Sequence, residues 1–135
     1  MGIVFYDSGQ YEDAIESYMN AIKIKPDYYD ALNNMGISFS ELEEYDKAIE
    51  CYKKAVEVNP DNSNVWYNMG ISYNDLKLYD KTIECYKKVL ELEPDNNKAW
   101  NNLGSTYADF EIYYSEMLCP YTLFCNRINL TLQTI

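Results

Sequence analysis

The sequence predicts an all-α fold, an α-solenoid of antiparallel helix-turn-helix repeats. Two observations predict it: residue types recur every 34 residues, and within each period apolar residues follow the three- and four-residue steps of an amphipathic helix. The recurring residues are Gly2, Gly36, Gly70 and Gly104, then Tyr11, Tyr45, Tyr79 and Tyr113, and then Pro26, Pro60 and Pro94.

Each period is expected to hold two helices. In residues 63–96 the first carries Trp66, Met69, Gly70 and Tyr73 on one face, and the second carries Tyr79, Ile83, Tyr86 and Leu90. Proline cannot continue a helix, so Pro94 ends the second. A mid-helix glycine costs about 1 kcal/mol relative to alanine. Its recurrence therefore predicts two helices that approach too closely for a β-carbon.

These residues resemble the tetratricopeptide-repeat (TPR) motif. One copy consists of Trp66, Met69, Gly70, Tyr73, Thr82, Tyr86 and Pro94, and a second of Leu32, Met35, Gly36, Phe39, Ala48, Tyr52 and Pro60. The resemblance implies a right-handed superhelix that binds other protein segments. It divides the chain into a partial repeat at 1–28 that lacks most of its first helix, repeats at 29–62 and 63–96, and the first helix of a further repeat at 97–114.

Residues 115–135 depart from the pattern. Glu116 occupies the small-residue column, and Pro120 occupies the aromatic column, where it would break a second helix. Three interpretations stay open: an aberrant tail from a frameshifted or misjoined terminus, a degenerate second helix, or a partner-binding tail. We therefore expect a chain truncated or fragmentary at both ends, which self-associates through its incomplete terminal repeats.

Charge restricts the class of partner. The chain has 22 acidic and 11 basic residues, a formal net charge of −11. This field repels nucleic acid and anionic membranes and attracts a basic protein segment. The sequence has no secretory start and no apolar run long enough to span a bilayer, so a cytoplasmic location is expected.

Catalysis and metal binding are not expected. The chain has no histidine, which is the commonest metal ligand and general base. Its glycines are isolated, so they form no phosphate-binding loop. Cys51, Cys85 and Cys119 follow the 34-residue period rather than a ligand spacing. We predict no enzyme activity, cofactor or metal, and we expect Cys51 and Cys85 to be free thiols.

The candidate binding surface is the second face of each first helix, which in the TPR fold lines the concave groove. The predicted groove residues are Asn33, Asn34, Ile37, Asn64, Tyr67, Asn68, Ile71, Asp75, Lys98, Asn101 and Asn102. An amide offers a donor and an acceptor, so it can pair with a peptide backbone without reading its sequence. The asparagine column resembles the ladder of O-linked N-acetylglucosamine transferases. Shared ancestry of the repeats would also explain it.

The sequence thus favours a protein-interaction adaptor that holds an extended segment in the groove. One alternative is a fragment of the substrate-recruiting arm of a larger enzyme, for example of the O-linked N-acetylglucosamine transferase type, or of a complex subunit. Another is a self-associating structural fragment. Capture of chaperone C-termini is disfavoured. Of the residues of that carboxylate clamp, Asn68 and Lys98 match, and Asn33, Ile37 and Asn102 do not. The helical phase of Tyr45, Tyr52, Tyr79 and Tyr86 places them in the core.

Overall fold

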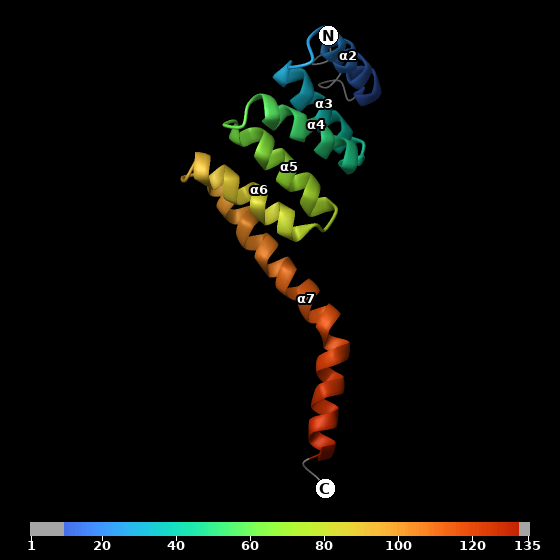
Figure 1. The fold of residues 1–135 in the computed structure, drawn as a ribbon, viewed down its shortest axis with the longest axis vertical. Coiled ribbons are helices and arrows are strands. Elements are labelled where there is room, and N and C mark those ends of the chain that lie inside the picture. The colour runs from blue at the N-terminus through green and yellow to red at the C-terminus, as the bar shows by residue number, and fades with distance from the viewer. Residues whose placement is uncertain (1–9, 133–135) are drawn as a thin grey trace.

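The computed structural model describes residues 10–132, with side chains described as far as Ser115. The helices are α2 (Tyr11–Ile24), α3 (Tyr29–Glu41), α4 (Tyr45–Val58), α5 (Ser63–Asp75), α6 (Tyr79–Leu92) and α7 (Asn97–Leu132). Each helix packs chiefly against the next one, and α7 continues beyond the array (Figure 1). Within the described range every regular element is a helix, which confirms the predicted all-α solenoid.

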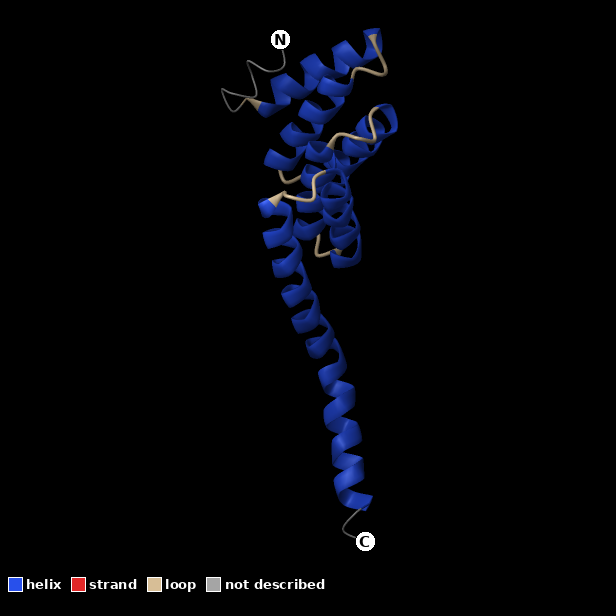
Figure 2. Ribbon diagram, turned by 90° about the vertical axis from the view of Figure 1, so that its left-hand side faces the viewer, coloured by secondary structure: helices blue, strands red, loops and turns tan. Residues whose placement is uncertain are grey.

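Short turns make the paired helices antiparallel (Figure 2). Glu43 and Lys77, one period apart, adopt left-handed backbone angles with φ of 59° and 57°. The next amide then bonds back across the helix end, Glu44 N to Phe39 O and Leu78 N to Tyr73 O, both at 2.9 Å. This satisfies carbonyls that a helix end leaves unpaired. The same reversal therefore follows α3 and α5.

Buried tyrosines form the centre of the core. Tyr52 is 1% exposed and belongs to a cluster built from α3, α4, α5 and α6, and Tyr86 is 2% exposed in a smaller cluster with Leu103. The predicted core position is confirmed for both rings. Tyr45 and Tyr79 are half-buried instead, because each lies at the start of its helix, where fewer neighbours cover it.

The predicted close approach at the recurring glycine is confirmed at two positions. A β-carbon on Gly36 would lie 2.5 Å from Cε1 of Tyr52, and one on Gly70 would lie 2.8 Å from Cε1 of Tyr86. The nearest side chain is thus the tyrosine ring of the second helix. At Gly104 a β-carbon would meet nothing within 4 Å. The reason given for the glycine therefore fails at that position, where no second helix covers α7 among the described residues.

Helix α7 differs from the sequence-based expectation. It spans 36 residues without a turn, and its backbone stays helical across Pro120, where the sequence predicts a break. A proline removes one hydrogen bond and crowds the preceding turn, which a helix can absorb by kinking. The boundary proposed at residue 114 does not coincide with a helix end. The division of the chain into repeats stays a prediction.

Candidate functional site: the face of the first helices

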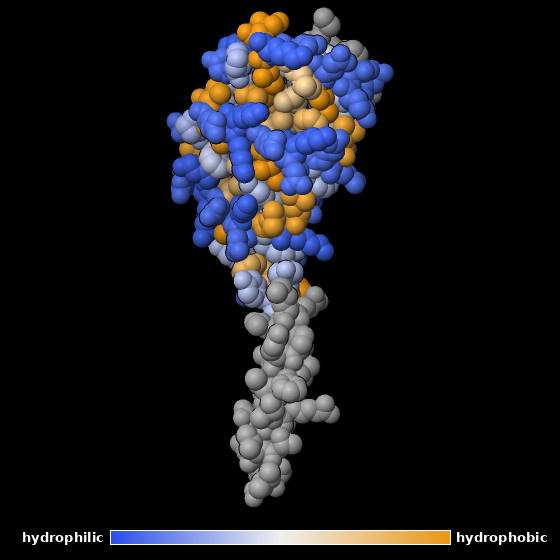
Figure 3. All heavy atoms as spheres, turned by 45° about the vertical axis from the view of Figure 1, so that its right-hand side comes forward, coloured by the Kyte–Doolittle hydropathy of each residue, from blue (hydrophilic) through white to orange (hydrophobic). Residues whose placement is uncertain are grey.

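The predicted groove residues all reach the surface of α3, α5 and α7. Five of them are exposed: Asn64, Ile71, Asp75, Lys98 and Asn101. The other six are half-buried: Asn33, Asn34, Ile37, Tyr67, Asn68 and Asn102. On the face of the array drawn in Figure 3, hydrophilic residues predominate and apolar patches lie between them.

A first hollow of about 290 Å³ lies between α5, α6 and α7. It is lined by Ile71, Asn74, Tyr86, Asn102, Ser105 and Thr106. Ile71 is 38% exposed and supplies an apolar wall. The Asn74 Oδ1 atom is buried and has no hydrogen-bond partner within the described part of the chain. An occupant that donates a hydrogen bond would offset the cost of that unpaired acceptor.

A second hollow of about 390 Å³ lies where α5 and α7 begin. It is lined by Asn64, Tyr67, Asn96, Asn97 and Lys98. Its Asn64, Asn97 and Lys98 side chains are exposed. The set combines amides, a phenol and one cation, so it suits hydrogen bonding to an extended chain more than burial of a large apolar group.

Asn102 connects the two hollows. Its Nδ2 donates to the Tyr67 hydroxyl at 3.0 Å and to the Tyr86 hydroxyl at 3.4 Å. Burial raises the pKa of Tyr86 to about 12, although the bond from Asn102 acts in the opposite direction. Tyr86 therefore stays protonated at neutral pH. With both amide hydrogens directed at tyrosines, the Asn102 carbonyl oxygen is the group available to an occupant.

The asparagine column is not a uniform ladder. Asn102 is anchored by Tyr67 as well as Tyr86, but one period earlier the equivalent of Tyr67 is Asn33, so Asn68 lacks a counterpart of that first phenol. Six predicted residues line neither hollow: Asn33, Asn34, Ile37, Asn68, Asp75 and Asn101. Ile37 packs against the main core cluster instead.

The structure adds residues that the sequence analysis missed. Asn74, Asn96, Asn97 and Thr106 line the hollows. Asn74 breaks the period, since Ser40 and Ala108 occupy the equivalent positions. Asn96 follows Pro94 and reads as a turn residue. Asn96 has Asn62 as its counterpart one period earlier, so recurrence alone does not separate a binding residue from a turn residue.

An acidic patch lies beside the same face. Burial, and then the charges of Asp75, Glu43 and Glu41, raise the pKa of Tyr45. The pKa of Asp75 is itself raised, first by burial and then by Glu43. Glu43 therefore acts on Asp75, and all three carboxylates act on Tyr45, near the ends of α3 and α5. Their combined field attracts cations.

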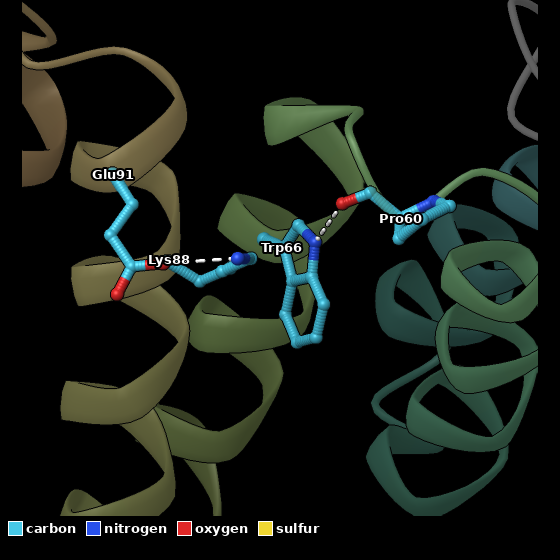
Figure 4. A network of polar contacts seen from close by, with 4 residues as sticks. All are labelled: Pro60, Trp66, Lys88 and Glu91. Atoms are coloured by element: carbon cyan, nitrogen blue, oxygen red, sulfur yellow. Dashed lines mark hydrogen bonds and ion pairs between the residues drawn. The ribbon is translucent and has the colours of Figure 1, made fainter.

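Each tryptophan fixes a first helix against the preceding turn. The Trp66 Nε1 donates to the Pro60 carbonyl at 2.8 Å (Figure 4), and the Trp100 Nε1 donates to the Pro94 carbonyl at 2.9 Å. Proline ends the preceding helix, and its carbonyl receives the indole hydrogen. The two bonds thus form the same contact between a first helix and the turn before it.

The described residues do not suggest other kinds of site. They contain no cluster of His, Cys, Asp or Glu that could hold a metal ion. Cys51 and Cys85 are buried free thiols. Burial raises their pKa values to about 11 and 12, which keeps both protonated. Among the described helices, none combines the length and apolarity required to cross a membrane.

Solved structures share this fold. The first TPR of Spaghetti (RPAP3), bound to HSP90 peptide SRMEEVD, is 24% identical with a TM-score of 0.79 and covers 82% of this chain and 87% of its own. MamA is 25% identical to this chain with a TM-score of 0.79, and the match covers 82% of this chain and 64% of the MamA chain. The Sgt2 TPR domain from Aspergillus fumigatus is 27% identical with a TM-score of 0.75, and the match covers 82% of this chain and 74% of the Sgt2 domain.

Family models identify the repeats in the sequence itself. No curated protein matches the chain. The family model described as tetratricopeptide repeat matches residues 29–62 and 63–96, and a second TPR repeat model matches residues 2–42. Together with the solenoid fold and the recurring glycine–tyrosine contacts, these matches show that the chain belongs to the tetratricopeptide-repeat family.

Proposed function

We propose that the chain is a protein-interaction adaptor that holds an extended segment of a partner protein against α3, α5 and α7. One observation carries the proposal: two hollows adjoin each other on this face. Tyr67 lines one and Asn102 lines the other, and their side chains are hydrogen-bonded. An extended segment exposes backbone donors and acceptors along its length, and the amides of this face can pair with them.

The charge of the chain supports a basic partner. The net charge is −11, and Glu41, Glu43 and Asp75 influence one site beside the face. RPAP3 is solved with the HSP90 peptide SRMEEVD, whose last four residues include three acidic ones. Of the groove residues predicted here, Lys98 is the cation. We expect an acidic terminus of that type to bind less well than a basic segment.

The test begins with a random peptide library displayed against the full chain. We expect recovered peptides to be enriched in lysine and arginine. The variant with both Asn64→Ala and Asn74→Ala, which removes one amide from each hollow, should then bind a recovered peptide about five- to 150-fold more weakly, because each neutral hydrogen bond contributes about 0.5–1.5 kcal/mol. Titration calorimetry measures the affinity. Asn102 is left unchanged because its amide also supports Tyr67 and Tyr86.

The matched control is Asn20→Ala, which changes an exposed asparagine on α2, away from the face. It should bind as the parent does, and circular dichroism should show equal helicity in all three proteins. Equal binding by the parent and the double variant would reject the amide contacts. Enrichment of acidic peptides would reject the basic partner.

A substrate-recruiting arm of a larger enzyme would use this same face. The asparagine column is the feature that favours it. The double variant separates the two functions when the chain is joined to its neighbouring domains. An arm would lose turnover of long substrates and keep turnover of short ones, whereas an adaptor would have no turnover to lose.

A further inference from the structure

Helix α7 exposes the face that its equivalents bury. On α5, Tyr73 is 6% exposed and Trp66 is half-buried. At the equivalent positions of α7, Tyr107 is 42% exposed and Trp100 is 55% exposed. These two side chains lie on the same side of α7 as Gly104, at steps of three and four residues. The described part of the molecule thus ends in an unpartnered aromatic face.

The preceding repeats show what kind of element covers such a face. Helix α4 covers α3 and places Tyr52 against Gly36, and α6 covers α5 and places Tyr86 against Gly70. Helix α7 has no turn between Asn97 and Leu132, so the described residues supply no covering helix. The cover that completes the pattern is an antiparallel helix with an aromatic ring directed at Gly104.

A hollow of about 460 Å³ marks the vacant position. It lies between α6 and α7 and is lined by Lys87, Leu90, Glu91, Trp100, Leu103 and Tyr107. The α7 side of this hollow is uncharged. This cradle, defined by those six residues, continues the row of helix contacts that joins α3 to α4 and α5 to α6.

We propose that the cradle binds α7 of a second copy of this chain, antiparallel and about a two-fold axis, with the Tyr107 ring of each copy against Gly104 of the other. Gly104 and Tyr107 are three residues apart on one face, so an axis between them forms both contacts at once. Such an isologous pairing needs a self-complementary surface, and a glycine beside a tyrosine provides one.

The arrangement reproduces contacts that already occur in the chain. The tyrosine–glycine pair and the antiparallel direction both match Tyr86 and Gly70. The pairing also buries two aromatic side chains per copy that α7 leaves in water. Trp100, Leu103, Gly104 and Tyr107 carry no charge, and the two charged residues on the α6 side of the cradle, Lys87 and Glu91, are exposed and opposite in sign, so two acidic chains can meet here. Their remaining charges repel, so association should strengthen as salt rises.

The test uses sedimentation of the full chain over a wide concentration range, with Gly104→Leu as the variant. In a single copy the added side chain enters open space, and leucine is a better helix former than glycine, so the fold should hold. In the pair it occupies the position of the partner's Tyr107. We expect the parent to dimerise and Gly104→Leu to raise the dimer Kd by about tenfold or more.

The matched control is Ser105→Leu, which adds the same side chain at an exposed site of the neighbouring face. It should dimerise as the parent does. In a Trp66→Phe background, emission from Trp100 should shift to shorter wavelength as the parent associates. A monomer at every concentration would overturn the proposal, as would a Gly104→Leu protein that associates as tightly as the parent. Equal weakening by both leucine variants would also reject the assigned face.

Discussion

The α5–α6 pair and the free helix α7 carry the same motif in different surroundings. Trp66, Met69, Gly70 and Tyr73 recur in α7 as Trp100, Leu103, Gly104 and Tyr107. On α5 the glycine lies under the Tyr86 ring and the tyrosine is buried, whereas on α7 the glycine is open and the tyrosine is 42% exposed. The energetic role of a repeat residue is therefore set by the helix that covers it, not by the motif itself.

The tryptophan of the motif makes the same hydrogen bond on α5 and on α7. The indole bond to the preceding proline carbonyl measures 2.8 Å at Trp66 and 2.9 Å at Trp100. That contact faces the turn before the helix, which is present in both cases. The comparison thus separates contacts with the preceding repeat, which α7 keeps, from contacts with a second helix, which the described residues do not supply for α7.

The largest difference should appear when tyrosines are truncated. Tyr52→Ala or Tyr86→Ala removes a ring that is 1% or 2% exposed, so we expect a loss of about 3–5 kcal/mol in the free energy of unfolding. Tyr107→Ala should cost about 0.5 kcal/mol or less. Urea unfolding of dilute protein, where α7 is unpaired, measures both. Similar losses at Tyr86 and Tyr107 would show that α7 is covered even in the single chain.

Replacing the glycines should have smaller effects on the free energy of unfolding, and their sign should differ between the covered positions and Gly104. Gly36→Ala and Gly70→Ala push a methyl group into a buried tyrosine ring, and we expect a loss of about 1–3 kcal/mol. Gly104→Ala should stabilise the chain by up to about 1 kcal/mol, because it meets open space and alanine favours helix. Thermal unfolding followed by circular dichroism gives the three values. A destabilised Gly104→Ala protein would contradict the open α7 face.

The smallest effect concerns Glu93, which joins the end of α6 to the start of α5. The Glu93 carboxylate accepts hydrogen bonds from the hydroxyl of Ser63, where α5 begins, and from Asn96 Nδ2 at 2.8 Å. These bonds lower the pKa of Glu93 below its ordinary value of 4.5, with burial opposing them slightly. The ionised form is therefore favoured in the folded state. Its stabilisation is present above pH 4.5 and is lost as the pH falls through the lowered pKa.

Ser63→Ala tests that contact, because it removes the first of the two donors and leaves the helices otherwise intact. The difference in the free energy of unfolding between parent and variant should be largest near neutral pH and should fall toward zero as the pH is lowered. Unfolding curves across the acidic range measure it. Ser105→Ala, which has no carboxylate partner among the described residues, is the control. A gap that widens toward low pH would contradict the assigned direction.

The sequence predicted the fold well because the signal repeats. One period contains the helix faces, the proline stop and the glycine, and the glycine recurs three more times and the proline twice more in the same phase. The candidate site was less predictable, since binding residues need not recur. Asn74 replaces Ser40 of the preceding period, and Asn102 depends on Tyr67, which has Asn33 as its counterpart. Most of the residues that line the hollows differ from one repeat to the next, so a search for recurring residues does not detect them.

By itself, the sequence determined the helical period, the antiparallel pairs and the burial of Tyr52 and Tyr86, because spacing along a chain fixes which residues share a helix face. Tertiary structure alone decided that α7 continues past Pro120 and that Gly104 stands open. It also decided that Asn102 turns its amide toward two tyrosines. Those outcomes depend on which helix lies opposite, and a helix face does not encode whether its partner is present.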